Sequence, residues 1–447
     1  MASAPGGRGE AEPWPLPIRI DLSDTSPDCK AETASEALRA RPGVAVFVAD
    51  GAKGEQAIAV SACGDLRAFV GGRLRGEGPR ADLSDVTTSI EACECGSGFE
   101  ADLACDEVAR VRTPEAAALA AGQRAACFVH LDPESEAPAC RVIEECRTLE
   151  GLDPATLIGP FAARSHAEHW AAMIDGEFEL CRKPSLLMMQ PRAEACQYKD
   201  MGLCPAPCDG SEPMEIYRAR VRSALAFDGA AFEAERGRLR SAIAESATSM
   251  DFEQAGILKK RLGALDAARS AGIGWVTTMD RFRVLAVMPS VKRGWVRIFL
   301  HDSGATRLLA DVRADAALAD KAAVDVVESG LRRMAREPAG FGPGEADRVA
   351  LVARHARSSR RTRGSLIAIW RDHGAGCSDS LDWGVDLSDH QRSDLMRAIR
   401  RLGGRSGDRP IGRQDGRKGE DEPNPPGANA VPGSPTPPRS GDDGTTA

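Results

Sequence analysis

Four cysteines in one short segment carry side chains that could bind a metal. Cys181, Cys196, Cys204 and Cys208 follow the spacing C-x14-C-x7-C-x3-C. Thiolates are soft ligands that suit zinc or iron–sulfur clusters, and four of them can close a site. Zinc sites usually present two close C-x2-C pairs, which this segment lacks, so a [4Fe-4S] cluster fits the spacing at least as well. Iron–sulfur, zinc and four thiols without metal remain the alternatives at this point.

The composition limits the kinds of protein that this chain can be. Its 447 residues predict about two to four domains, and a net charge of -8 argues against non-specific nucleic-acid binding by the whole chain. No apolar run approaches the roughly 18 residues that span a bilayer, and the N-terminus lacks the apolar core of a signal peptide. We therefore expect a cytoplasmic protein with no membrane contact. Its thirteen cysteines are expected to be thiols or metal ligands rather than disulfides.

The pattern of apolar residues predicts a multidomain α/β chain. Short apolar runs predict strands at 43–48, 57–60, 282–287 and 295–300, and helical spacing predicts helices at 65–74, 315–336 and 387–402. The expected domains are a disordered segment at 1–17, a small α/β domain at 18–113, a linker with the cysteine cluster at 114–213, a helical hairpin at 214–270, an unassigned C-terminal α+β module at 271–403 and a disordered tail at 404–447.

The helical hairpin predicts a surface for another protein. Apolar residues recur at helical spacing on both of its stretches, and a two-helix unit of this length cannot bury both apolar faces alone. An ordinary hairpin packed on its own core is the simpler alternative. The side chains that we predict to contact a partner are Ile243, Ala247, Met250, Phe252, Glu253, Ala255, Leu258 and Leu262.

One run of arginines could contact DNA. Its members are Arg354, Arg357, Arg360, Arg361 and Arg363. Arginines at this density can bind phosphates, but they equally suit a solvated basic surface on a chain that is acidic elsewhere. Nearby, His301 and Asp302 are adjacent at the end of a predicted strand, where they indicate a turn rather than a catalytic pair.

The cysteine segment resembles the middle of the excinuclease UvrC. The resemblance rests on Gly159-Pro160-Phe161, on Phe178-Glu179-Leu180-Cys181-Arg182 and on the run from Ala195 to Gly210, which contains Cys196-Gln197-Tyr198 and Pro207-Cys208-Asp209-Gly210. These motifs occur in the family's order over some 50 residues. The resemblance implies that the four cysteines hold an iron–sulfur cluster, with zinc as the alternative.

The hairpin resembles the UVR motif of the same family. The stretch from Met250 to Leu258 is similar to the motif's F-E-x-A-A-x-L core. In the family this motif docks on an equivalent hairpin of the helicase-like protein UvrB, so the resemblance implies a UvrB-like partner. One departure is that Lys259-Lys260 stands where the family usually has Arg-Asp.

The N-terminal domain is similar in position to the GIY-YIG nuclease domain of UvrC, but its chemistry is missing. Ala45 and Ala59 align with the family's two tyrosines. Ala62 aligns with its lysine, Phe69 with its arginine and Cys105 with its metal-binding glutamate. A metal-binding carboxylate would require a shift in register to Asp106 or Glu107. The landmarks of the family's C-terminal nuclease are not found in residues 271–404.

The sequence therefore predicts a UvrC-like protein of nucleotide excision repair that has no catalytic residues of its own. It would bind a cluster through the cysteines and dock on UvrB through the hairpin, and it could contact DNA through the arginine run. The alternatives are an active excinuclease-type DNA incision enzyme and a metal-binding UVR adaptor outside DNA repair.

Overall fold

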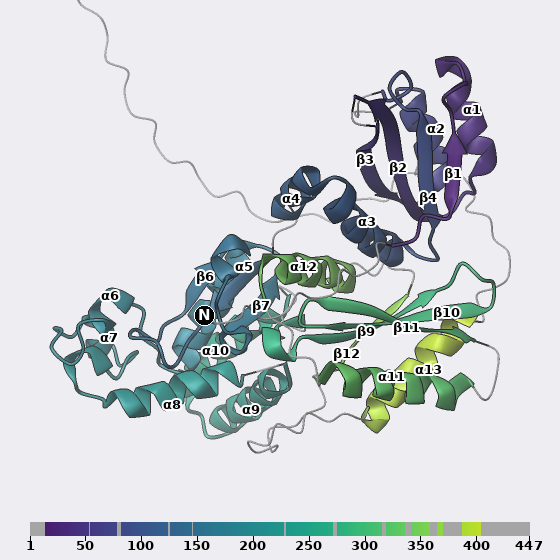
Figure 1. Ribbon diagram of the computed structural model, residues 1–447. Helices are drawn as coiled ribbons and strands as arrows, with labels where there is room; N and C mark the ends of the chain where they lie inside the picture. Colours follow the sequence, from purple (N-terminus) through teal and green to yellow (C-terminus); the bar gives the residue numbers. More distant parts are fainter. Residues whose placement is uncertain are drawn as a thin grey trace, which may run out of the picture. The chain divides into compact units, whose positions relative to one another are not determined.

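The computed structural model describes residues 14–52, 54–77, 82–123, 126–144, 146–227, 229–270, 275–314, 319–335, 341–357, 364–369 and 387–403. Across these ranges the chain forms thirteen α-helices and three four-stranded antiparallel sheets (Figure 1). This mixed α/β architecture agrees with the predicted class. None of the helices in these ranges is long and apolar enough to cross a membrane. The predicted tail at 404–447 lies outside the described residues.

The first sheet is apolar on both faces because helices cover both of them. Its strands are ordered β1-β4-β2-β3, with bounds β1 (Ile18–Asp21), β2 (Gly43–Gly51), β3 (Gly54–Cys63) and β4 (Ser89–Glu94). The surrounding helices are α1 (Pro27–Ala37), α2 (Leu66–Leu74), α3 (Gly98–Arg112) and α4 (Pro114–Gln123). Ala45 and Phe47 pack with α1 and α2, whereas Val44 and Val46 pack toward α3. The strands predicted at 43–48 and 57–60 and the helix at 65–74 are confirmed.

The N-terminal segment extends this domain further than we predicted. We expected disorder through residue 17, but residues 14–17 lie against the sheet. Trp14 and Leu16 pack on the apolar cluster that contains Val44 and Cys93. Two large apolar side chains offset the Pro-rich composition that suggested disorder, because their burial stabilises the segment. Residues 1–13 lie outside the described part of the chain.

The second sheet lies beside the cysteine segment, and its strands were not predicted. It has the order β6-β5-β7-β8, with bounds β5 (Cys127–His130), β6 (Arg141–Ile143), β7 (Leu157–Phe161) and β8 (Thr277–Thr278). Helix α5 (Arg164–Glu177) supplies Trp170 and Ile174 to the core of this unit. Pairing of Thr278 with Ile158 brings the start of the predicted C-terminal module into this sheet.

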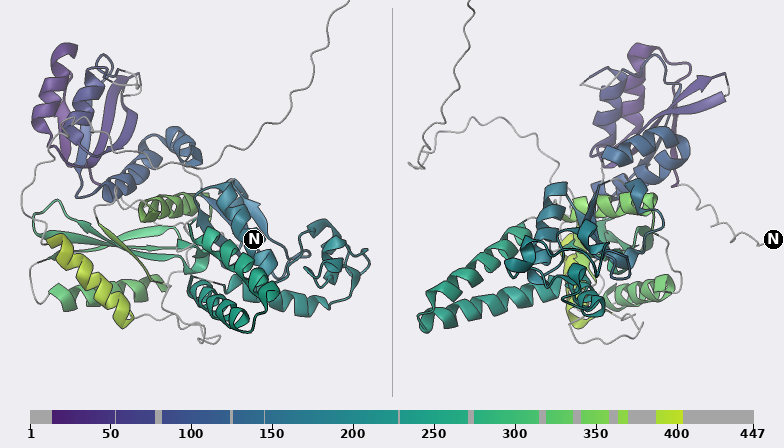
Figure 2. Two further views of the ribbon diagram at one scale, coloured as in Figure 1. Left: turned by 180° about the vertical axis from the view of Figure 1, so that it is seen from behind. Right: turned by 90° about the vertical axis from the view of Figure 1, so that its left-hand side faces the viewer.

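Three helices, not two, occupy the region predicted as a hairpin. They are α8 (Met214–Leu225), α9 (Gly229–Thr248) and α10 (Phe252–Ser270). Helix α8 is separate because the chain turns at Phe227, whose N–H donates to the Ala224 carbonyl at 3.2 Å. The hairpin itself consists of α9 and α10, which are seen as two long antiparallel helices in the right-hand view of Figure 2.

The third sheet is also buried on both faces. Its order is β11-β10-β9-β12, with bounds β9 (Arg283–Pro289), β10 (Trp295–Asp302), β11 (Ala305–Arg313) and β12 (Ser365–Ala368). The helices are α11 (Ala319–Ala335), α12 (Pro343–Arg357) and α13 (Asp389–Gly403). Val284 and Ala286 face the core shared with α12, and the alternate residues Leu285 and Val287 face α11 and α13. The predicted strands and the helix at 387–402 are confirmed within about two residues at each end, and α11 confirms the helix predicted at 315–336 over 319–335, the rest of that range lying outside the described residues.

Candidate metal centre and partner-binding hairpin

The four cysteines are positioned by short elements between α5 and α8. Cys181 follows α5, and Cys196 immediately precedes α7 (Gln197–Asp200). Cys204 and Cys208 lie in the loop that leads to α8. Within this loop Ala206 has a left-handed backbone (φ 58°) between Pro205 and Pro207, so the chain turns sharply between the last two cysteines. Cys181, Cys204 and Cys208 are buried, and Cys196 is half-buried.

A buried tyrosine anchors the cysteine segment. The Tyr217 hydroxyl accepts a hydrogen bond from the Cys181 backbone N–H at 3.0 Å and donates to the Pro138 carbonyl at 2.7 Å. The side chain of Tyr217 is fully buried, and burial raises the pKa of its phenol. The hydroxyl therefore satisfies two backbone groups that would otherwise lie unpaired in the core.

The thiols are close enough to perturb one another. A hydrogen bond from the Cys181 thiol lowers the pKa of Cys204 to about 6, and the same bond raises the pKa of Cys181. Burial, followed by the charges of Asp209, Cys204 and Cys196, raises the pKa of Cys208. Arg182 is a nearby cation that also favours the Cys204 thiolate, and its guanidinium donates to the Leu203 carbonyl at 2.9 Å. Cys204 is thus the cysteine of this segment whose thiolate is favoured over its thiol.

The donor chemistry of this cluster suits a soft metal. The pKa values of Cys181, Cys204 and Cys208 are shifted by neighbouring thiols of the segment, and these three sulfurs are shielded from water. Within the described ranges, however, no three His, Cys, Asp or Glu side chains stand in a metal-binding arrangement. The Cys181, Cys204 and Cys208 side chains belong to one apolar cluster, and the Cys181 sulfur accepts a hydrogen bond from the Lys183 N–H at 3.4 Å, but the thiols do not form a ligand shell in this conformation.

Some of the predicted contact residues of the hairpin are exposed to solvent, and the others pack in the protein core. Ala247, Met250, Phe252 and Glu253 are exposed around the turn, with 77% of Met250 and 71% of Phe252 accessible. Ala255 is half-buried. In contrast, Leu258 is buried in the core that contains the cysteines, and Ile243 and Leu262 pack against this core. The exposed apolar surface is therefore confined to the turn and the start of α10.

The hairpin turn has a defined conformation. Met250 adopts a left-handed backbone (φ 59°), and the Asp251 N–H donates to the Ser246 carbonyl at 2.9 Å. The Asp251 carboxylate then accepts a hydrogen bond from the Gln254 N–H at 3.0 Å and caps α10. The turn thus holds Met250 and Phe252 in a fixed exposed position.

The positions aligned with nuclease residues are apolar and covered. Ala62 and Cys105 pack around one cluster with Val44, and Trp14 and Leu16 lie against that same cluster. Ala45 is fully buried. Within the described residues, this face offers a phosphate neither a tyrosine hydroxyl nor a cation from these aligned positions.

The two carboxylates proposed as substitutes have different surroundings. Asp106 is buried and pairs with Arg110 at 2.9 Å, with Arg348 at 3.9 Å. Glu107 lines a cavity, and burial raises the pKa of its carboxyl. Asp106 therefore already serves as an internal ion-pair partner, which limits its use as a metal ligand.

The described part of the arginine run contacts the chain itself. Arg354 forms an ion pair with Asp102 of α3 at 3.1 Å, and Arg357 donates to the Pro160 carbonyl at 3.1 Å. Burial lowers the pKa of Arg357. Arg360, Arg361 and Arg363 lie outside the described residues. The two described arginines therefore have internal roles.

His301 and Asp302 mark a turn, as predicted. Strand β10 ends at Asp302, and Ser303 (φ 48°) and Gly304 (φ 97°) connect it to β11. His301 is buried, its Nδ1 lies 2.7 Å from the Thr306 hydroxyl, and burial lowers its pKa to about 3. Asp302 pairs with Arg283 at 3.0 Å.

Sequence reasoning missed two residues of the cysteine segment, Tyr217 and Arg182. A signal for Tyr217 was available, since it is one of only two tyrosines in the chain and lies at an inward position of a helix. Arg182 follows Cys181 directly, and its side chain lies over the Tyr198 ring at 5.2 Å. Its contact with Leu203 could not be read from the sequence.

Comparison with known proteins identifies part of the chain. Residues 126–227 match the family model for the UvrC/Cho excinuclease middle domain. The chain is similar to the UvrABC system protein C of Halobacterium salinarum, with 30% identity over 263 residues, 55% of this chain and 42% of that protein. The corresponding protein of Thermus thermophilus is 26% identical over 217 residues, 48% of this chain and 35% of the relative.

These matches cover less than half of the relatives' own length, at most 42% for these two proteins. No solved structure matches the chain. The matched middle domain contains all four cysteines and α8, so the chain is UvrC-like in the segment where the motifs occur.

Replacing Tyr217 should loosen the cysteine segment. In Tyr217→Phe the Cys181 N–H and the Pro138 carbonyl lose their shared partner, so we expect the free energy of unfolding to fall by about 1–3 kcal/mol. Urea denaturation would measure this loss. Tyr198→Phe is the matched control, because it keeps the ring face that contacts Arg182. Equal stability of the two variants would show that the Tyr217 hydroxyl contributes no more than an exposed one.

Proposed function

Because the chain is UvrC-like, we propose that it acts in nucleotide excision repair as a non-cutting component. In this proposal the four cysteines bind a metal cluster, and the turn of the α9–α10 hairpin binds a UvrB-like protein. The observation that carries the proposal is a common core: Cys181, Cys204, Cys208 and Leu258 belong to one apolar cluster. The two functional segments are thus parts of a single folded unit.

Cys181, Cys196, Cys204 and Cys208 would hold the cluster. Four thiolates are the usual ligands of a [4Fe-4S] cluster, and such a cluster would supply a rigid cross-link between α5, α7 and the loop before α8. The preference for the Cys204 thiolate and the burial of three sulfurs support soft-metal binding. Zinc, which also accepts four thiolates, is the alternative cofactor.

Metal content tests the cofactor. Protein purified without oxygen should contain about four irons and four sulfides per chain, and Cys204→Ser should lose most of them, since a cluster with three thiolates is weakly held. Iron, sulfide and zinc analysis together with the absorption spectrum would measure this. Cys127→Ser, a buried thiol outside the segment, is the control. A content of one zinc per chain would show that the site binds zinc instead of a cluster. Protein without metal would contradict both the cluster and the zinc site.

The exposed turn of the hairpin supports protein docking. Met250, Phe252 and Ile257 are all at least half exposed, although each is a large apolar side chain. Beneath them the hairpin is fixed: Arg236 pairs with Asp266 across the two helices, and Arg261 pairs with Glu177 of α5 at 2.6 Å. A rigid support with exposed apolar residues at one end favours a binding role for that end.

Removal of Phe252 should weaken binding to a UvrB-like protein. Phe252→Ala removes a large exposed side chain without disturbing the core, so we expect at least tenfold weaker binding and unchanged stability. Calorimetry with purified UvrB would measure the affinity. Leu119→Ala, another exposed apolar side chain (73% accessible) on α4, is the control. If wild-type protein binds neither UvrB nor DNA, the adaptor function outside DNA repair becomes the better interpretation.

The apolar cluster around Ala62 and Cys105 supports the absence of cutting by the N-terminal domain. We expect no incision when the purified protein is incubated with damaged duplex DNA, a UvrB-like protein and magnesium. The assay would follow the appearance of nicked strands on a denaturing gel, with an active UvrC as the positive control. Incision that disappears in Asp106→Asn or Glu107→Gln would instead establish the alternative of an active enzyme.

A further inference from the structure

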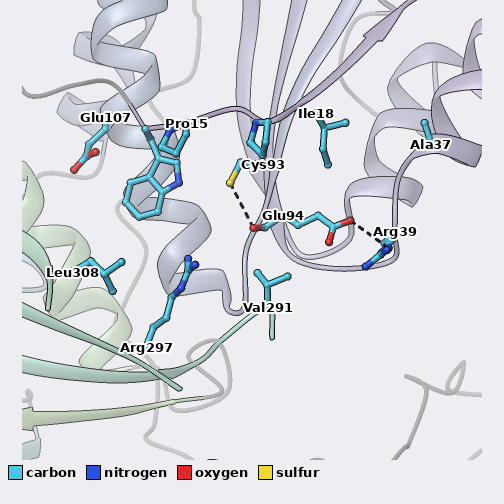
Figure 3. A pocket seen from close by; sticks show the side chains of 12 residues that line it. Pro15, Ile18, Ala37, Arg39, Cys93, Glu94, Glu107, Val291, Arg297 and Leu308 are labelled. Carbon is cyan, nitrogen blue, oxygen red and sulfur yellow. Dashed lines mark hydrogen bonds and ion pairs between the residues drawn. The ribbon is translucent and has the colours of Figure 1, made fainter. Parts of the chain in front are cut away.

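A cavity of about 770 Å³ lies beside the end of β4. Its lining includes Cys93, Glu107, Arg297 and Leu308, together with the indole of Trp14. Figure 3 shows the Cys93 sulfur and the Arg297 guanidinium pointing into this space. The cavity lies outside the metal segment and the hairpin, and among its described lining residues Cys93 supplies the only thiol.

A second thiol lies next to the first. Cys93 belongs to β4, and the Cys95 N–H extends the strand pairing by donating to the Pro42 carbonyl at 2.7 Å. Residues two apart in extended chain point to the same side, and both side chains accordingly lie in the cluster with Val44. The Cys95 thiol donates to the Cys93 carbonyl at 4.0 Å, and the Cys93 thiol donates to the Glu94 carbonyl at 3.5 Å. Cys93 therefore has a second thiol on the same side of the strand, as a candidate to act on a product formed at its sulfur.

The surroundings of Cys93 favour its thiolate. The neighbouring Cys95 thiol, the Trp14 indole and the charge of Arg297 together lower the pKa of Cys93 to about 7. Burial and the charge of Glu100 act in the opposite direction. Glu100 is itself fully buried and paired with Arg297, so its charge is largely compensated.

We propose that Cys93 is an oxidation site that reacts with small hydroperoxides entering this cavity, and that Cys95 converts the product to a disulfide. Cys93 is buried overall but lines the cavity, and a cavity-lining thiol beside a second cysteine is an arrangement of redox-reactive thiols. This site is independent of the function proposed above, because it uses none of the four clustered cysteines or the hairpin.

The reaction consists of two balanced steps. The Cys93 thiolate attacks one peroxide oxygen, the O–O bond breaks, and the leaving oxygen takes a proton to become water or an alcohol. The sulfur loses two electrons to the peroxide and becomes a sulfenic acid. The Cys95 sulfur then attacks the Cys93 sulfur, the S–S bond forms, and the sulfenic oxygen leaves as water with the Cys95 proton.

The sequence offers a direct assay for this disulfide. The tryptic peptide 81–110 contains Cys93, Cys95 and Cys105, and cleavage after Glu94 separates the first two cysteines. The reduced full-length protein would be treated with one equivalent of hydrogen peroxide and then with a thiol-blocking reagent. Trypsin and a protease that cleaves after glutamate would then digest it. We expect mass spectrometry to show the two fragments joined through Cys93 and Cys95, before the exposed thiol of Cys29 is oxidised. Earlier oxidation of Cys29, or a bond from Cys93 to Cys105, would overturn the proposal.

Variants separate the roles of the three residues. Cys95→Ser should stop the reaction at a Cys93 sulfenic acid that dimedone traps, whereas Cys105→Ser, from the same cluster, should leave the disulfide unchanged. Trp14→Phe should slow alkylation of Cys93 by iodoacetamide about threefold to tenfold at about pH 6 and leave the rate at about pH 10 unaffected, because it removes one donor to the thiolate.

The pH profile supplies a readout that a purely structural role would not move. In the wild-type protein the alkylation rate of Cys93 should rise with pH and reach half its maximum near pH 7. A midpoint at the ordinary thiol value of about 8.5 would refute an activated Cys93, whether or not Trp14→Phe folds.

Discussion

The hydroxyl group of Tyr217 is the interaction on which the cysteine segment depends. It joins α8 to the Cys181 backbone and to the Pro138 carbonyl, and it is fully buried. Between α5 and α8 the chain has few regular hydrogen bonds, since α6 (Pro184–Leu187) and α7 are single turns. A segment with so little secondary structure must be held by side chains, and here one phenol satisfies two of its buried backbone groups.

The same core links the cysteines to the hairpin. Leu239 of α9 and Leu258 of α10 pack in the cluster that contains Cys204 and Cys208. Outside the core, Arg261 of α10 holds Glu177, four residues before Cys181. A change in the cysteine loop would therefore be transmitted to the base of the hairpin, because well-packed interiors deform little. A metal bound at the thiols would stabilise the orientation of the exposed turn.

Local sequence patterns predicted the elements of the N-terminal domain and of the C-terminal module. The contacts between segments distant in sequence could not be predicted from such patterns. Strands β2 and β9 are continuous apolar runs because both faces are covered, and this signal is strong in one sequence. The strands of the second sheet are three to five residues long in β5, β6 and β7, too short for a periodic pattern. Likewise, Arg354 belongs to a conspicuous basic run, but its partner Asp102 lies 252 residues away in sequence, and only the fold brings them together.

Helix α3 packs the N-terminal domain against the C-terminal module. Its acidic side chains pair with the C-terminal module: Glu100 with Arg297 and Asp102 with Arg354, and Phe99 packs with Phe299 in a shared core. A catalytic face must stay open to DNA and must keep charged groups partly solvated, whereas a packing face must exclude water and pair every charge. Ala62, Cys105, Trp14 and Leu16 all pack around one apolar cluster, so this face is closer to the second arrangement. Charged side chains placed at these positions would be partly buried without a partner, so the apolar residues and the internal ion pairs of α3 are two consequences of one packing role.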